Sequence, residues 1–187
     1  MRNIILLRFF SFCLLLFTFA FSPGKGVFIS QNGTVKFVSK APLETIKAES
    51  KKLSGALDAE KRTFAFAIPI ISFEGFNSPL QKEHFNENYL ESEKIPNAIF
   101  KGKIIEEVDL DTPGTYTIRA KGTMNIHGVD KEMIIKSKVT TTAAQMAIES
   151  SFTITLKDFN IIIPKLVNQK IAEDILVDVK MDMVPKK

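Results

Sequence analysis

The chain has 187 residues, 45% of them hydrophobic, with a formal net charge of +4, one cysteine, no tryptophan and sixteen phenylalanines. Residues 1–20 hold two arginines, no acidic residue, five of the phenylalanines and the cysteine, which leaves the rest of the chain with a net charge of +2. This balance excludes the many phosphate contacts of a nucleic-acid-binding surface, so no nucleic-acid partner is expected. The cysteine-free remainder folds without disulfides.

The N-terminus has the pattern of a secretory signal peptide. Arg2 precedes an almost uninterrupted apolar run from Phe9 to Phe21, and Thr18-Phe19-Ala20 places small residues where a signal peptidase cleaves. The run is shorter than the roughly 20 residues that cross a bilayer. We therefore predict a signal peptide over residues 1–20, cleaved near Ala20, with retention as an anchor as the alternative. One domain then spans 21–187, and the expected location is the periplasm.

Period-two alternation of apolar and polar residues dominates the rest of the chain. It indicates strands with one buried and one solvated face, as in antiparallel sheets. In chain order, the apolar faces are Val35 and Phe37; Phe64, Phe66, Ile68 and Ile70; Tyr116, Ile118, Ala120, Gly122, Met124 and Ile126; Met146, Ile148, Ser150, Phe152, Ile154 and Leu156; and Ile175, Val177, Val179, Met181 and Met183.

Turn residues separate these strands. Asn32-Gly33 predicts a hairpin between two short strands, residues 126–130 predict a hairpin between two long ones, and residues 111–114 predict a further turn. About eight strands without a repeat predict an all-β sandwich or barrel. Because the alternation persists into the last strand, a single closed antiparallel barrel is favoured.

Two short helices and one irregular loop are also expected. Ser78 is a helix N-cap followed by proline, which predicts a helix from Pro79 to about residue 86 or 88. A second helical turn is predicted over residues 42–47. Residues 159–172 do not alternate, and we interpret them as a covered loop that crosses one mouth of the barrel.

The apolar faces mix large and small side chains. Ala98, Gly102, Ala120, Gly122 and Ser150 share these faces with phenylalanines, and small residues within a strand leave space, admit a ligand or permit a bend. An eight-stranded barrel either packs its lumen solid or encloses one small ligand. Composition alone favours the packed core and leaves the cavity as the alternative.

Two segments resemble the signatures of the YceI-like family. One runs from Phe85 to Gly102 and contains Ile95-Pro96-Asn97-Ala98-Ile99-Phe100; the other, from Gly122 to Lys131, contains the hairpin sequence Ile126-His127-Gly128-Val129-Asp130. The resemblance extends from Gly26 to Met183. It implies an extended, lipocalin-like barrel of about eight strands with one or two short helices, exported in many bacteria, whose elongated lumen holds a polyisoprenoid or similar amphipathic lipid.

The candidate site follows from the alternation and the resemblance together. His84 and Phe85 are expected at the barrel mouth. The predicted lining of the lumen is Phe37, Phe64, Phe66, Ile68, Phe100, Ile118, Met124, Phe152, Ile154, Val177 and Val179.

No catalytic or metal-ligating group is predicted. His84 and Glu87 alone are too few for a metal site, His127 lies in a turn, and no nucleophile motif or phosphate-binding loop is present. We therefore expect no enzyme activity and no cofactor apart from a bound lipid.

The favoured hypothesis is a carrier or sequestering protein for an isoprenoid-like or other amphipathic lipid. We interpret Lys40, Lys47, Lys51 and Lys52 as a solvated basic face, with transient contact to anionic lipid head groups of a membrane surface as the alternative. The alternative is a solidly packed barrel that binds a protein through the insertion at residues 78–96. A monomer and a dimer both remain open.

Overall fold

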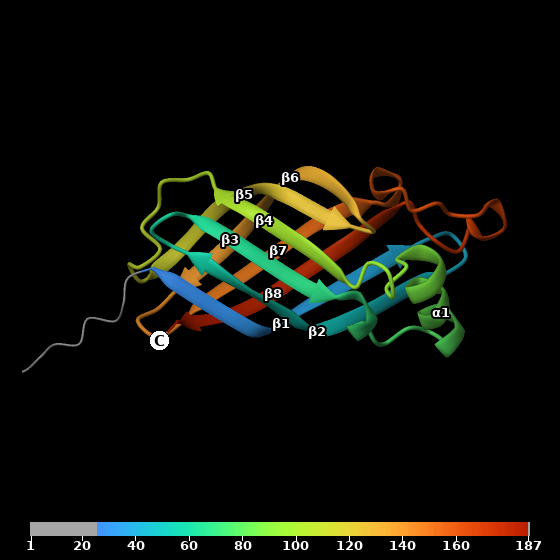
Figure 1. Cartoon of the computed structure of the whole chain (residues 1–187), viewed down its shortest axis with the longest axis horizontal. Coiled ribbons are helices and arrows are strands. Elements are labelled where there is room, and N and C mark those ends of the chain that lie inside the picture. The colour runs from blue at the N-terminus through green and yellow to red at the C-terminus, as the bar shows by residue number, and fades with distance from the viewer. Residues whose placement is uncertain (1–25, 187) are drawn as a thin grey trace, which may run out of the picture.

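The computed structural model describes residues 26–186, and eight strands in this range form one closed antiparallel barrel (Figure 1). Strands adjacent in the chain are adjacent in the barrel, and pairing of the last strand with the first closes it. The all-β, eight-stranded antiparallel barrel is thus confirmed, whereas the predicted signal peptide lies outside the described residues. The strands are β1 (Val27–Lys40), β2 (Thr45–Asp58), β3 (Thr63–Pro69), β4 (Asn97–Ile104), β5 (Gly114–Ile126), β6 (Val129–Thr141), β7 (Met146–Thr155) and β8 (Asp174–Pro185).

The connections gather at two ends of an elongated barrel (Figure 1). One end, here the α1 end, carries the connections of residues 41–44, 70–96, 127–128 and 156–173. The other end, here the terminal end, carries the connections of residues 59–62, 105–113 and 142–145, and both ends of the described chain.

The long hairpin of β5 and β6 shows how the sequence pattern produces the barrel wall. The two strands pair without a register shift from Gly114 opposite Thr141 to Ile126 opposite Val129. The turn between them, His127-Gly128, has positive φ at both residues (52° and 73°), as a tight hairpin turn requires. The hairpin predicted here is confirmed, and it places His127 at the α1 end.

The helix predicted at Pro79 is present. α1 (Pro79–His84) begins where the Ser78 hydroxyl accepts a hydrogen bond from the Gln81 N–H at 3.2 Å. It continues as a π-helical turn, η2 (Phe85–Tyr89), so the helical segment ends close to the predicted position. Three short 3₁₀ turns complete the described structure: η1 (Ile70–Ser72), η3 (Leu156–Phe159) and η4 (Lys165–Val167).

Two local predictions are wrong. Asn32-Gly33 does not form a hairpin but lies inside β1, where register shifts on both sides of Gly33 mark an irregularity in the pairing with β2. The predicted helical turn at residues 42–47 is replaced by a tight connection, in which the Ala41 N–H donates to the Glu44 carbonyl at 3.0 Å, and by the start of β2. In both places, pairing between neighbouring strands outweighs the local preference.

The glycine pair on β4 and β5 permits close packing of the backbones and does not make space in the lumen. Gly102 lies directly opposite Gly122. A Cβ atom built on Gly102 would lie 2.1 Å from the Lys121 carbonyl oxygen, and one built on Gly122 would lie 2.3 Å from the Lys101 carbonyl oxygen. Side chains at these positions would push the two strands apart, so the glycines serve the curvature of the barrel.

Within residues 26–186, no helix has the length and apolar character needed to span a membrane.

Candidate functional site

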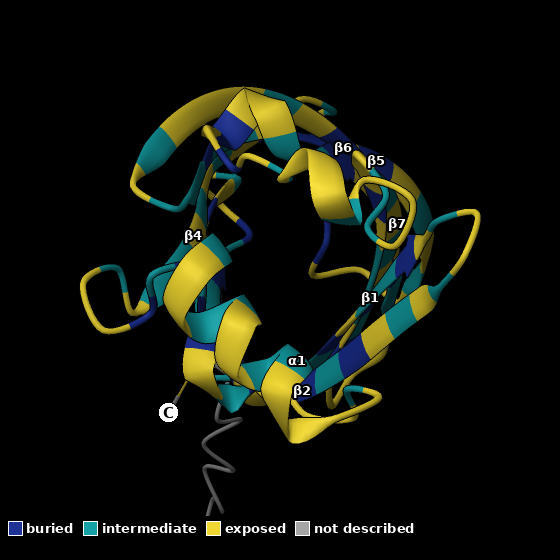
Figure 2. Cartoon of the chain, turned by 90° about the vertical axis from the view of Figure 1, so that its right-hand side faces the viewer, coloured by how far each residue is buried: buried dark blue, intermediate teal, exposed yellow. Residues whose placement is uncertain are grey.

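The barrel encloses a cavity of about 560 Å³ that opens at the α1 end. Figure 2 looks onto this end, with α1 at the lower rim. Nine of the residues predicted from the alternation line the cavity, and His84 and Phe85 line it as well. The nine are Phe37, Phe66, Ile68, Phe100, Met124, Phe152, Ile154, Val177 and Val179.

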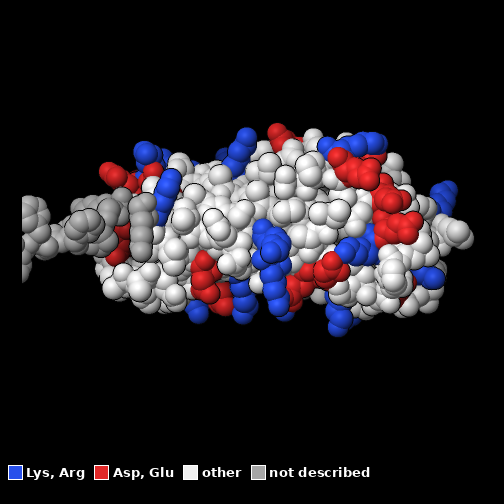
Figure 3. Space-filling model, turned by 60° about the horizontal axis from the view of Figure 1, so that its bottom comes forward, with Lys and Arg blue, Asp and Glu red and all other residues white. Residues whose placement is uncertain are grey.

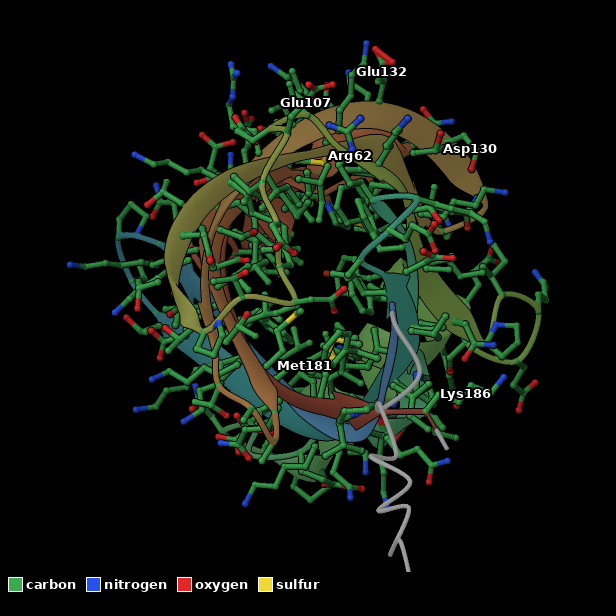
Figure 4. The ribbon with its side chains drawn as sticks, turned by 90° about the vertical axis from the view of Figure 1, so that its left-hand side faces the viewer. Arg62, Glu107, Asp130, Glu132, Met181 and Lys186 are labelled. Atoms are coloured by element: carbon green, nitrogen blue, oxygen red, sulfur yellow. The ribbon has the colours of Figure 1, made fainter. Side chains whose placement is uncertain are left out.

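Phe64 and Ile118 face the barrel interior but do not line the cavity. Both belong to a tightly packed cluster that fills the terminal end, and the Phe64 ring lies 4.9 Å from that of Phe100. Figure 4 views this end, with Arg62 and Glu107 at its rim. The cluster also includes Leu57, Ile104, Leu110, Val139, Met146 and Met183, each at most 2% exposed. The lumen is therefore solid at one end and hollow at the other.

A group of phenylalanines forms one wall of the mouth. The Phe37 ring stacks on Phe85 with centroids 5.4 Å apart, and Phe73 and Phe76 contact Phe85 at 5.8 Å and 5.1 Å. Phe73 and Phe76 were not predicted from the sequence, because they lie in the connection between β3 and β4, where no alternation marks an inward face. Their position just before the Ser78 helix cap was the available signal. The cluster fixes α1 against the barrel rim.

The polar groups of the cavity are few and mostly lie near the mouth. Inside the lumen, the hydroxyls of Ser137 and Ser150 are hydrogen-bonded to each other at 2.7 Å. At the mouth, the Gln81 side-chain amide donates to Glu44 at 2.6 Å, and Lys170 lines the opening. An amphipathic molecule would therefore place its apolar part deep in the barrel and its polar part at the α1 end.

The loop of residues 156–173 crosses part of the mouth, as predicted, but it is only partly covered. Ile161 is 5% exposed, whereas Ile162 is 82% exposed. The Ala172 N–H donates to the Ser39 hydroxyl at 2.8 Å, and the Leu43 N–H donates to the Gln169 carbonyl at 2.9 Å, so the loop rests on the end of β1 and on the connection that follows it.

His127 links three connections at the α1 end. Its Nδ1 lies 3.1 Å from the Phe159 carbonyl oxygen, and its Nε2 lies 3.3 Å from a carboxylate oxygen of Glu91. A neutral imidazole has one N–H and donates to one of these acceptors, whereas a doubly protonated ring donates to both. The pKa of Glu91 is lowered, first by its hydrogen bond from Lys94 and further by His127. The sequence predicts His127 only as a turn residue, and this role was not predicted from it.

We expect a His127→Asn change to loosen the mouth without disturbing the hairpin. Asn-Gly favours the same left-handed turn, but the shorter side chain cannot reach both acceptors. Loss of the bridge is expected to cost about 1 kcal/mol of folding free energy. Amide hydrogen exchange should accelerate more in residues 156–162 than at Val139 in the terminal end, where it follows only the change in global stability. Unchanged exchange in residues 156–162 would contradict a bridging role for the imidazole.

The cavity contradicts the alternative in which the whole lumen is packed solid. Its volume is well above that of a single-side-chain void, and its walls come from all eight strands. Among the described residues, 26–186, no three His, Cys, Asp or Glu side chains converge in a way that would hold a metal ion. What the arrangement offers is enclosure of an apolar chain.

Comparisons with solved structures show that this barrel has known counterparts. A polyisoprenoid-binding domain from Saccharophagus degradans, implicated in plant cell wall breakdown, superimposes with a TM-score of 0.72 at 15% identity, covering 86% of this chain and 99% of that one. BcnA from Burkholderia cenocepacia gives a TM-score of 0.66 at 17% identity, covering 80% and 95%. The YCEI protein of Campylobacter jejuni gives 0.59 at 17% identity, covering 74% and 84%.

A search of curated proteins found no match. The sequence model of the YceI-like domain, in contrast, matches residues 25–183, which include every strand except the last residues of β8. The chain therefore belongs to the YceI-like domain family.

Proposed function

We propose that this protein binds the apolar tail of an isoprenoid-like or other amphipathic lipid in its lumen and carries or sequesters that lipid without transforming it. The observation that carries the proposal is the cavity of about 560 Å³, open at one end and lined almost wholly by hydrocarbon. A dry cavity of about 150 Å³ holds benzene, so this one has room for roughly 20 carbons. That capacity corresponds to a tail of about four isoprene units, with any further length outside.

The energetics of such a site need few directional bonds. Each methylene transferred from water to the lumen contributes about 0.8 kcal/mol of binding free energy, so burial of its apolar surface is enough to bind a long tail. The polar groups at the mouth, Glu44, Gln81 and Lys170, then face the head group. The fold shared with the Saccharophagus polyisoprenoid-binding domain supports this choice of ligand class.

The proposal includes export to the periplasm, supported by the signal-peptide pattern of residues 1–20. Fractionation of a bacterial host that expresses the full chain, followed by measurement of the intact mass, tests it. The expected product is periplasmic and lacks the residues up to about Ala20.

The binding function is tested by what co-purifies. The full chain is expressed in a bacterial host, purified without detergent and extracted into organic solvent for mass spectrometry. We expect a lipid with a long unbranched or isoprenoid tail at close to one per protein. After the lipid is removed, the protein should take up a fluorescent polyprenyl probe. Absence of both a bound lipid and probe uptake would overturn the proposal.

A further inference from the structure

Three large aliphatic side chains are exposed on two loops that touch each other at the α1 end. Leu43 is 67% exposed, Ile162 is 82% exposed and Leu166 is 95% exposed. The loops are held together by the hydrogen bond from the Leu43 N–H to the Gln169 carbonyl. We call residues 40–47 and 160–170 together the apolar tip. Both segments lie at the α1 end of the barrel (Figure 1).

The tip presents its apolar residues on a fixed backbone. Ile161 is buried while Ile162 is exposed, and Val167 lines the cavity while its neighbour Leu166 points to solvent. Leu43 lies in the turn closed by the hydrogen bond from the Ala41 N–H to the Glu44 carbonyl. In each segment, anchored groups hold an apolar side chain outward. Contact of large aliphatic side chains with water is unfavourable, and their grouping on the surface indicates a binding surface.

The charge of the tip is strongly positive. Residues 40–47 and 160–170 contain four lysines, Lys40, Lys47, Lys165 and Lys170, and one acid, Glu44. Glu44 already accepts hydrogen bonds from Asn77 and Gln81. Among residues 26–186, none of these four lysines forms an ion pair. Their ammonium groups are therefore available to an anionic surface.

We infer that the apolar tip is a docking surface for an anionic lipid bilayer. Separate aliphatic side chains surrounded by lysines are the combination that enters the boundary between head groups and acyl chains. The tip also borders the opening of the cavity, since Val167 and Lys170 line it. Docking there would place the mouth against the membrane and let a lipid tail pass between bilayer and lumen without crossing water. This inference takes its purpose from the proposed function, but docking is measured separately from lipid uptake.

The neighbouring rim of the mouth, which the hydrogen bond from Gln81 to Glu44 joins to the tip, gives the docking a direction. α1 carries the exposed Leu80, but it also carries Glu83, and Glu87 follows in η2. In Figure 3, basic and acidic groups are interspersed along the visible face, and acidic groups gather toward the right-hand end, where Figure 1 places α1. An anionic membrane would repel that rim and attract the tip, so the barrel is expected to tilt with the tip toward the lipid.

The chain has no tryptophan, so a single introduced indole can report on the tip. The full chain with Leu166→Trp is mixed with vesicles of phosphatidylglycerol and phosphatidylethanolamine, and with vesicles of phosphatidylcholine alone. We expect a blue shift of the emission with the anionic vesicles, weakened as salt is raised. In the same background, a combined Leu43→Ser and Ile162→Ser change should reduce vesicle affinity about tenfold or more. Lys40→Gln with Lys165→Gln, which removes two of the four lysines, should weaken the preference for anionic lipid.

The matched control substitutes exposed aliphatic residues of the barrel wall, Ile134→Ser with Val184→Ser, which should leave vesicle binding unchanged. Vesicle binding without a shift of the emission at position 166 would overturn the inference, because another part of the chain would then be responsible. Equal loss in tip and wall variants would also overturn it. Self-association that the tip changes abolish, without any response to vesicles, would assign the tip to a second copy of the chain. Failure of lipid uptake with intact docking would instead overturn the proposed function alone.

Discussion

Replacing Ala120 with phenylalanine is expected to shorten the longest lipid tail that the protein takes up. Ala120 is 8% exposed and lines the cavity on β5, opposite Ile104 at the end of β4 that meets the packed cluster. An aromatic ring there would occupy the inner end of the cavity and leave the mouth open. Tails that reach the inner end should lose affinity tenfold or more, whereas tails several carbons shorter should bind nearly as before.

The same substitution at the other end of the cavity should act differently. Ala98 also lines the cavity, but it lies near the start of β4 and pairs with Ile68 close to the mouth. A phenylalanine at position 98 is therefore expected to weaken binding of tails of every length. Ala65, which is exposed on the outer face of β3, is the matched control, since Ala65→Phe adds the same ring outside the barrel.

The measurement is a titration of each variant, freed of lipid, with fluorescent polyprenyl probes of increasing length. Because overpacking costs about 1–3 kcal/mol, denaturant unfolding must first show that each variant remains folded. If the longest probe tail that binds becomes shorter only in Ala120→Phe, the inner end of the cavity, toward the terminal end, limits the length of the bound tail. Identical profiles for all three variants would show that the probes bind elsewhere.

The sequence predicted the barrel well because the signal is repeated along every strand. On β5, Ile118, Ala120 and Met124 are buried and Lys121 is exposed, as the period-two pattern requires. Local turn chemistry was less reliable. Asn32-Gly33 favours a hairpin on its own, but β1 pairs with β2 on one side and β8 on the other, and these two ladders keep it extended through the irregularity.

Alternation identifies the face of a side chain but says nothing about its depth. Phe64 and Phe66 are two residues apart on the same face of β3, and only Phe66 lines the cavity. Phe64 belongs instead to the packed cluster of the terminal end, which also contains Leu110 from the connection between β4 and β5. Phe73 and the bridge formed by His127 were missed for the same reason, because long-range contacts between connections leave no periodic trace in the sequence.

The second large effect is expected at Leu110, a member of the packed cluster at the terminal end. Leu110 is 1% exposed although it lies in a connection rather than a strand. The connection is folded inward by local bonds: the Asp111 N–H and the Thr112 hydroxyl donate to Asp109 at 3.0 Å and 2.7 Å. Its first residues are fixed to the wall, since the Arg119 N–H donates to the Glu106 carboxylate at 2.6 Å. The loop cannot readily collapse into a void, so Leu110→Ala should lose about 3–5 kcal/mol of stability.

Two further variants isolate the cause. Leu43→Ala is the same chemical change at a side chain that is 67% exposed, and it should alter the free energy of unfolding by no more than about 0.5 kcal/mol. Leu110→Met nearly keeps the volume of the side chain and should cost less than about 1.5 kcal/mol of folding free energy. Denaturant unfolding of lipid-free protein gives all three values. If Leu110→Ala were no more destabilising than Leu43→Ala, the side chains at the terminal end would not form a tightly packed cluster around Leu110. The depth of the lumen, and with it the tail length inferred from Ala120, would then have to be set by other residues.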